Sequence, residues 1–265
     1  MNQQIMPVGA QLRGWRQRRR MSQLDLALEA DISSKHLSFV ETGRAKPSRE
    51  MILHLSDRLA VPPREQNILL LAAGYAPHFP ARPLDDPSLA AARKAVDLVL
   101  TGHEPFPAVA VDRHWTLISA NRMIGPLLAT VAPVLLEPPV NVLRIALHPD
   151  GLAPQIRNLP EWRHHLLHRL RQQIEASADA TLIALMDELE SYPAHASTPP
   201  ARQTDYGGVA IPLQLETPAG LLSMFSTVTV FGTPIDITLS ELAIEAFFPA
   251  DESAADILKK IAETT

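Results

Sequence analysis

The stretch MSQLDLALEADISSKHLSFVETG, residues 21–43, contains two helix starts eleven residues apart. Ser22 and Asp25 have the spacing of a capping box, in which each side chain bonds the backbone N–H of the other residue. Ser33 or Ser34 can cap a second helix, since a serine hydroxyl accepts an N–H that the helix leaves unpaired. The sequence therefore predicts two short helices joined by a tight turn.

Apolar spacing predicts how these two helices pack. Leu24, Ala27 and Leu28 are expected to face inward in the first helix. Leu37 and Val40, three residues apart, are expected to do so in the second. A side chain larger than that of Ala27 would clash where the two helices meet.

The turn between the helices requires a positive φ at Asp31, where glycine is usual and aspartate is tolerated. Beyond it the inward residues of the second helix leave four side chains on its outer face, towards its N-terminal end: Ser34, Lys35, Ser38 and Phe39. That end reaches base edges when such a helix lies in the major groove of DNA.

Three further helices complete the first 75 residues. One is predicted over Val8–Arg19, with Leu12 and Trp15 inward. Pro47-Ser48 opens the next, whose apolar stripe is Ile52, Leu55 and Leu59. Pro62-Pro63 opens the last, which contains the apolar run Ile68, Leu69, Leu70 and Leu71 and ends at Gly74.

Charge is distributed unevenly along the chain. Residues 1–75 carry 11 Lys/Arg against 7 Asp/Glu, whereas residues 76–265 carry 13 against 22. Five arginines lie within the first twenty residues, without an acidic residue among them: Arg13, Arg16, Arg18, Arg19 and Arg20. A basic head on an acidic chain indicates an anionic partner for the head, although a solvated helix face would show the same charges.

Residues 8–75 resemble the helix-turn-helix of the lambda-repressor-like, or XRE, regulators. The shared pattern is Ser22-Gln23-x-x-Leu26-Ala27 followed by Leu37-x-x-Val40-Glu41-x-Gly43. The resemblance implies a double-stranded DNA operator as partner and a structural ion pair between Arg16 and Glu41. It also implies the DNA-binding residues Gln23, Ser33, Ser34, Lys35, His36, Ser38, Phe39 and Arg44.

The implied roles differ among these residues. Gln23 would bond a phosphate and brace the second helix, and His36 and Arg44 would meet phosphates. The base-reading positions would be Ser34, Lys35, Ser38 and Phe39. Serine tolerates several bases, lysine favours guanine, and a phenyl ring can touch a thymine methyl.

A proline-rich segment, residues 76–88, is predicted to be a semi-rigid linker between domain 1–75 and domain 89–265. After it, two strands are expected within 106–120 around Asp112-Arg113. Helices follow, including an apolar one over 121–137 broken by prolines and an amphipathic one over 160–176. A loop over 193–206 precedes a hairpin over 208–231, a strand over 239–248 and a closing helix capped by Asp251.

This order of elements predicts an α+β chain, with five helices followed by a five-stranded antiparallel sheet covered by helices on one face. Residues 106–121 resemble the opening of a PAS sensor fold. Residues 104–253 are similar to the MmyB-like ligand-binding domain, chiefly through NVLRIALHPDGL, NLPEW and FGTPIDITLSELAIEAFFPAD. The resemblance implies a small-molecule pocket between sheet and helices that accepts fatty-acid-like or other apolar ligands.

The residues also suggest a lining for that pocket. Met123, Ile124, Leu127 and Leu128 are expected to face the sheet, opposite Val109, Leu117, Met224 and Phe225. Such a lining suits an apolar ligand, but an ordinary filled core explains it more often. The predicted ligand-binding residues are Met123, Leu127, Arg144, Met224 and Phe225. Arg144 is included because it can anchor a ligand carboxylate; the alternative is that it pairs with a buried acid such as Asp150.

Other chemistries have little support in the sequence. The chain has no cysteine, which excludes disulfides and thiolate metal sites. Glu161, His164 and His168 have a metal-ligand spacing, but the two histidines lie opposite the apolar stripe and are expected to face solvent. No serine-hydrolase elbow or phosphate-binding glycine loop is present. We therefore expect no enzyme activity, no cofactor and no metal.

The sequence thus predicts a cytoplasmic transcription regulator that binds DNA as a homodimer and responds to a ligand, with no contact to a membrane. Two alternatives remain open. In the first, a lipid-binding or protein-interaction module uses the helical domain for docking. In the second, the larger domain only dimerises and holds no ligand.

Overall fold

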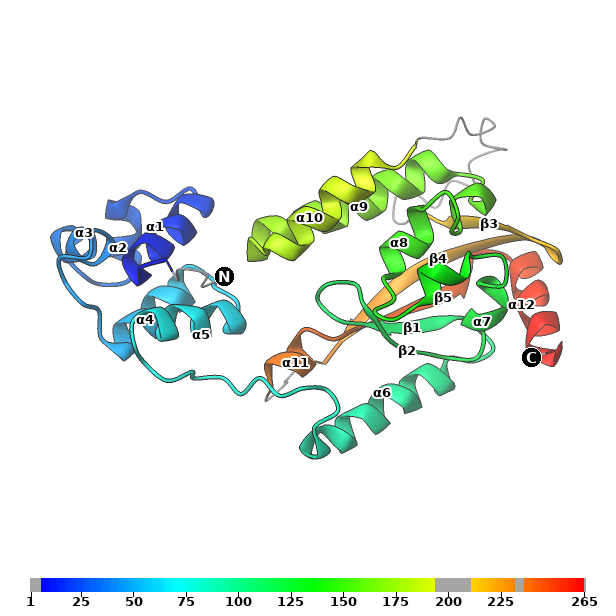
Figure 1. Cartoon of the computed structure of the whole chain (residues 1–265), viewed down its shortest axis with the longest axis horizontal. Helices are drawn as coiled ribbons and strands as arrows, with labels where there is room; N and C mark the ends of the chain where they lie inside the picture. The colour runs from blue at the N-terminus through cyan, green and yellow to red at the C-terminus, as the bar shows by residue number, and fades with distance from the viewer. Residues whose placement is uncertain (1–5, 194–210, 232–235, 265) are drawn as a thin grey trace. The chain divides into compact units, whose positions relative to one another are not determined.

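The computed structural model describes residues 6–193, 211–231 and 236–264. The chain divides into two compact units (Figure 1). The first comprises Met1–Arg82 and Ile235–Ile237, and the second comprises Pro83–Pro234 and Thr238–Thr265. The first is helical and the second combines helices with a sheet, so the predicted α+β class is confirmed.

Five helices occupy the predicted positions in the first unit: α1 (Val8–Arg18), α2 (Gln23–Glu29), α3 (Ser34–Glu41), α4 (Arg49–Arg58) and α5 (Pro63–Ala72). Ser22, Ser33 and Ser48 cap α2, α3 and α4 through their hydroxyl groups. The core of this unit is a single cluster that includes the fully buried Leu12, Leu26, Leu37, Ile52, Leu55, Leu59, Leu69 and Leu70.

All five helices end with the same backbone motif. The residue after each C-cap has a positive φ, and these residues are Arg20, Asp31, Gly43, Ala60 and Gly74. The N–H that follows bonds back into the last turn, as Ile32 does to the Ala27 carbonyl at 3.0 Å. The positive φ predicted for Asp31 is confirmed, at 50°.

Two inward residues predicted in α2 are wrong. Leu24 and Leu28 are 59% and 71% exposed, whereas Leu26 and Ala27 are buried. Residues 24 and 28 each lie two positions from Leu26, about 200° around the helix axis, so they point away from the core. The prediction for Ala27 is confirmed, since it is 2% exposed.

The start of the proline-rich segment packs against α5. The Asn67 side chain accepts the N–H groups of His78 and Phe79 and donates to the Phe79 carbonyl at 2.7 Å. Asn67 is itself buried. The first compact unit therefore continues through Arg82, beyond the expected start of the linker.

The second unit is built on five antiparallel strands: β1 (Ala108–Val111), β2 (Leu117–Ala120), β3 (Leu213–Thr217), β4 (Gly220–Val230) and β5 (Ala243–Pro249). Their order in the sheet is β2-β1-β5-β4-β3. β5 comes last in the chain and lies between β1 and β4, where it pairs with both. The predicted five-stranded antiparallel sheet is confirmed; residues 208–210 of the expected hairpin lie outside the described residues, as does most of the loop expected over 193–206.

The other elements of the second unit are helical. They are η1 (Pro87–Leu89), α6 (Ala90–Gly102), α7 (Ile124–Leu127), η2 (Pro133–Leu136), α8 (Val142–Leu147), η3 (Ala153–Gln155), α9 (Leu159–Ser177), α10 (Ala180–Ser191) and α12 (Glu252–Thr264). A short α11 (Ile237–Ser240) begins within the residues assigned to the first unit. It occupies the start of the strand expected over 239–248, which instead begins at Ala243. The apolar helix expected over 121–137 is two short pieces, α7 and η2, because a proline interrupts helical hydrogen bonding.

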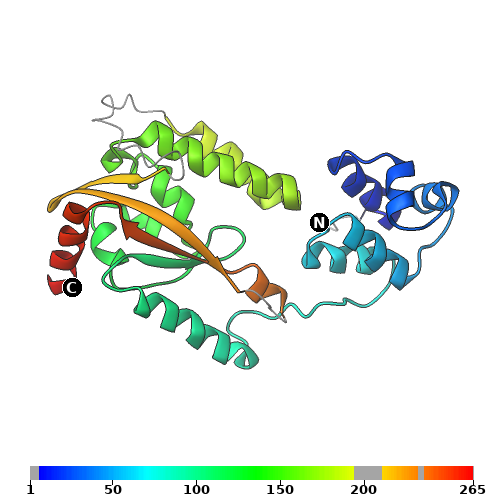
Figure 2. The same ribbon diagram turned by 180° about the vertical axis from the view of Figure 1, so that it is seen from behind.

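Helices cover both faces of the sheet, so the prediction of a single covered face is wrong (Figures 1 and 2). On one face, Val96 and Leu100 of α6 pack on Ala108, Ala110 and β5. On the other face, Leu213 and Met224 belong to a cluster that includes residues of α8, α9 and α10. Side chains alternate along a strand, and this alternation separates the two cores.

Candidate DNA interface and ligand-binding domain

The two serines of the opening stretch fix where α2 and α3 begin. The Ser22 hydroxyl accepts the Asp25 N–H at 3.1 Å, and the Asp25 carboxylate accepts the Ser22 N–H at 2.8 Å. The Ser33 hydroxyl accepts the His36 N–H at 3.1 Å. Ser33 therefore caps α3, and the helix places Ser34 in its first turn.

Burial of one side of α3 determines which side chains remain outside. Leu37 and Val40 are 0% and 1% exposed and hold the helix against the core. Ser34 and Lys35 are exposed, and Ser38 and Phe39 are half-buried. The exposed positions lie towards the N-terminus of α3, where unpaired N–H groups and the helix dipole favour an anion.

Phe39 is flanked by two cations. The Lys35 ammonium and the Arg44 guanidinium each lie 5.9 Å from the centre of its ring. This distance allows a cation–π attraction. Positive charge is thus concentrated around the aromatic side chain on the outer side of α3.

A buried ion pair fixes α3 against α1. Arg16 donates from Nε and Nη2 to the two carboxylate oxygens of Glu41, at 2.7 and 2.9 Å. Gln23 donates to the same carboxylate at 2.7 Å. Arg16 also donates to the Met21 carbonyl. The Arg16–Glu41 pair implied by the resemblance is therefore present, and Gln23 braces α3 through Glu41.

Glu41 has a pKa below its ordinary value of 4.5. Burial by itself raises this pKa, because it penalises the charged form. Hydrogen bonds from Arg16 and Gln23, together with the charges of Arg16 and Arg13, outweigh burial. Glu41 is consequently a carboxylate at neutral pH.

Two of the five arginines in the basic head have structural roles. Arg16 pairs with Glu41, and Arg19 donates to the carbonyls of Leu59 and Ala60 at the end of α4, at 2.8 and 3.0 Å. Arg13, Arg18 and Arg20 are exposed. The role of Arg19 escapes sequence analysis because its two acceptors are backbone carbonyls some forty residues away.

Three of the five predicted ligand-binding residues lie in one apolar cluster. Met123, Leu127 and Met224 are 0%, 9% and 1% exposed and belong to the core beneath α8, α9 and α10. Phe225 follows Met224 in β4 and therefore points to the opposite face, where its ring stacks on Phe248 with 5.4 Å between centroids. The predicted grouping of Phe225 with Met123 is thus wrong.

Arg144 pairs with an acid that sequence analysis did not select. It lies in α8 and forms a two-pronged pair with Glu188 of α10, at 2.8 and 2.7 Å. The predicted partner, Asp150, instead lies near His148. Tyr192 donates to Glu188 at 2.6 Å. The pKa of the Tyr192 hydroxyl is raised, chiefly by burial and secondly by this hydrogen bond.

The described residues contain neither a metal-ligating cluster nor a membrane-spanning helix. The rings of His164 and His168 stack on α9 with 6.3 Å between centroids, and no group of three metal-ligating side chains occurs within the described residues. Among those same residues, no helix has both the length and the apolar character needed to cross a bilayer.

A capped helix pair whose second helix leaves Ser34 and Lys35 exposed at its N-terminal end is typical of the helix-turn-helix class of DNA-binding proteins. Residues 7–67 match the family model of a helix-turn-helix domain. Residues 92–261 match that of the MmyB-like transcription regulator ligand binding domain, which spans more than half of the chain. The chain therefore belongs to the MmyB-like transcription regulators and is a DNA-binding regulator. No curated protein matches it.

Proposed function

We propose that this regulator binds a specific DNA operator as a homodimer, reads it with α3, and responds to an apolar small molecule held in its second unit. It acts without enzymatic chemistry or a cofactor. The arrangement of α3 carries the proposal: Ser34 and Lys35 are exposed while Leu37 and Val40 are fully buried.

The chemistry of α3 supports sequence reading. Lys35 donates to guanine acceptors, the serine hydroxyls of Ser34 and Ser38 accept or donate, and Phe39 contacts a thymine methyl. His36 and Arg44 meet phosphates, as does Gln23 with the amide atoms that Glu41 leaves free. Ser33 contributes its backbone at the helix start, because its hydroxyl is occupied by the cap.

The proposal of a homodimer rests on the length of DNA that one domain covers, and the proposal of a ligand response rests on differential ligand affinity. One such domain covers a short half-site, and a two-fold dimer spans two half-sites about one helical turn apart. A ligand alters DNA binding only if it binds one arrangement of the dimer better than another. We place this ligand beside Met123, Leu127 and Met224. Arg144 lies at the edge of that core, and a ligand carboxylate binds it in competition with Glu188, which already accepts from its Nε and Nη2.

The test is a mobility-shift assay with the DNA upstream of the regulator's own gene, followed by footprinting. A double variant, Lys35→Ala with Ser38→Ala, should lose preference for the operator by about tenfold or more, because each lost base contact costs discrimination. Weak general binding should remain, since it depends on phosphates.

Lys260→Ala is the matched control, because Lys260 is an exposed lysine of α12 in the second unit. It should leave the footprint unchanged. An unaltered footprint in the α3 double variant would refute the assignment of α3. Absence of any shift at low salt would instead favour a docking role for the helical unit.

A further inference from the structure

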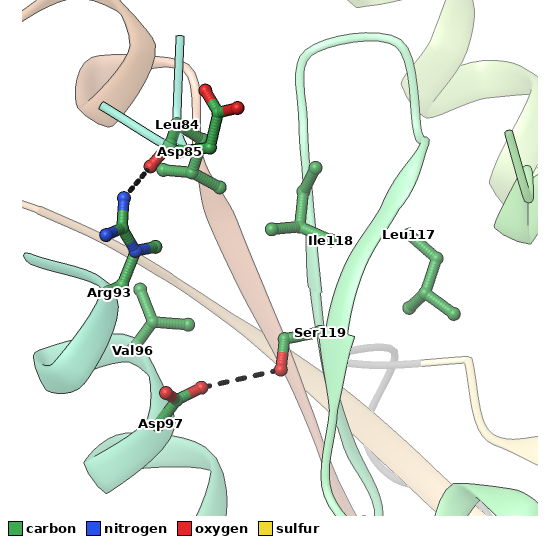
Figure 3. Close-up of a pocket in the computed structure, with 8 residues that line it drawn as sticks. All are labelled: Leu84, Asp85, Arg93, Val96, Asp97, Leu117, Ile118 and Ser119. Atoms are coloured by element: carbon green, nitrogen blue, oxygen red, sulfur yellow. Dashed lines mark hydrogen bonds between the residues drawn. The ribbon is translucent and has the colours of Figure 1, made fainter. Parts of the chain in front are cut away.

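A pocket of about 570 Å³ lies within the second unit, beside α6 and the edge strand β2 (Figure 3). Its walls come from the chain just before η1, from α6 and from β2: Leu84, Asp85, Arg93, Val96, Asp97, Leu117, Ile118 and Ser119. It lies on the side of the sheet that α6 covers, away from the core that contains Met224. It is therefore separate from the ligand site proposed above.

Arg93 contributes the positive charge among the lining residues of this pocket, which also include Asp85 and Asp97. Its Nη1 donates to the Leu84 carbonyl and to the Asp86 carbonyl, the latter at 3.0 Å. Arg93 is half-buried, and it forms no ion pair with any residue that the structure describes. Nε and Nη2 therefore remain available for a planar anion such as a carboxylate.

Asp97 contributes the opposite charge. It lies one turn after Arg93 on α6, a spacing at which the two side chains would ordinarily pair. Here they diverge: Arg93 reaches towards Leu84, and Asp97 lies 3.5 Å from the Ser119 hydroxyl (Figure 3). A cation site and an anion site are thus held apart in one pocket.

The surface between the two charges is apolar. Val96 of α6 is buried, and Ile118 of β2 is directed towards Leu84 and Arg93 (Figure 3). Ile118 is 38% exposed, although it belongs to a strand of the sheet. An occupant with an apolar body would remove this surface from water.

We infer that this pocket binds a small zwitterion with an apolar body, of the α-amino-acid class. Its carboxylate lies on Arg93, its ammonium on Asp97, and its side chain on Leu84, Val96 and Ile118. Arg93 already joins α6 to the end of the proline-rich segment through the Leu84 and Asp86 carbonyls, and the occupant adds its contact with Leu84. This inference does not depend on DNA binding.

The probes are L-leucine and its two half-charged analogues, 3-methylbutylamine and 4-methylpentanoate, titrated into the full chain by saturation-transfer NMR. Leucine should bind saturably and about fivefold more tightly than either analogue, because each analogue lacks one partly exposed charged contact. Absence of saturable leucine binding would overturn the inference.

Three variants locate the binding. Asp97→Asn should weaken leucine about fivefold and leave 4-methylpentanoate unchanged, because it removes only the partner of the ammonium. Ile118→Lys should abolish leucine binding by placing a long charged chain on the apolar wall. Asp187→Asn, an exposed acid of α10, is the matched control and should have no effect. Leucine binding unaltered in Asp97→Asn or in Ile118→Lys would also overturn the inference.

Discussion

At the residue scale, Gly9 determines how closely α1 approaches α3. A Cβ atom at this position would lie 2.2 Å from the Val40 carbonyl oxygen and 2.9 Å from that of Glu41. Both obstacles are backbone atoms at the end of α3, so neither can rotate away. Gly14, in the same helix, has no atom within 4 Å of the corresponding point.

These two glycines make a matched pair of variants. Gly9→Ala should lower the free energy of unfolding of the helical unit by about 3 kcal/mol, because overpacking forces the backbone to move. Gly14→Ala should raise it by about 1 kcal/mol, because alanine is the better helix former. Urea unfolding followed by circular dichroism measures both. Equal effects of the two substitutions would contradict the close approach of α1 to α3.

The buried pair of Arg16 and Glu41 makes the same unit sensitive to acid. The pKa of Glu41 is lowered in the folded state. Its ionisation therefore contributes stability above the unfolded pKa, near 4.5, and this contribution is lost as the pH falls through the lower folded pKa.

Glu41→Gln should lower the free energy of unfolding by about 3 kcal/mol at pH 7, since Arg16 would keep a buried charge without its counterion. The variant should also lose less stability than the parent chain between pH 5 and about pH 3, because the titrating group is gone. Urea unfolding across this range measures both effects. A variant with the acid sensitivity of the parent would show that another group dominates.

At the element scale, the helix ends of the first unit show where sequence signals are incomplete. Glycine marks two of the five positive-φ positions, Gly43 and Gly74. The other three are Arg20, Asp31 and Ala60, of which only Asp31 was predicted from its place in the turn. At Ala60 this conformation accompanies the local helix-end bond from the Val61 N–H to the Ser56 carbonyl, although an L-residue pays about 1 kcal/mol for it.

Ala60→Gly should therefore stabilise the helical unit by about 0.5 kcal/mol, after subtracting the greater freedom of glycine in the unfolded chain. Gly43→Ala should destabilise it by about 1 kcal/mol, since Gly43 has a φ of 74° and nothing within 4 Å of an added Cβ. Thermal unfolding of the two variants compares the signs. A loss of stability in Ala60→Gly would show that φ is not the cause.

At the scale of the whole molecule, positive and negative charge are distributed unevenly between the helical unit and the rest of the chain. The first 75 residues carry an excess of positive charge and the remainder an excess of negative charge. We therefore expect DNA attraction to come from the exposed cations of the helical unit, among them Arg18, Arg20 and Lys35. Arg16 and Arg19 do not belong to this set, because their guanidinium groups hold the fold together.

Binding should accordingly weaken steeply as salt is added. The slope of log affinity against log salt should fall by about 0.9 for each phosphate contact removed, so Arg18→Gln with Arg20→Gln should lower it by about 2. Arg19→Gln should instead reduce stability. Filter binding at several salt concentrations measures the slope. An unchanged slope in the double variant would exclude these two arginines from the phosphate contacts.

The sequence by itself determined the features that depend on neighbours along the chain. Ser22, Asp25, Ser33 and Gly43 specified helix starts and an end, because caps act within one turn. Apolar spacing predicted α3 and the five strands, because periodicity is also a property of neighbouring residues. The inward residues of α2 were predicted partly wrong.

Only the tertiary structure decided which side chains meet across the chain. In the folded chain Arg144 pairs with Glu188, and Phe225 lies on the face opposite Met224. Arg93 and Ile118 line the same pocket. These contacts join segments far apart in sequence, and local periodicity carries no information about them. The order of the strands and the distance at which the helices pack determine these contacts, and both exist only in the folded chain.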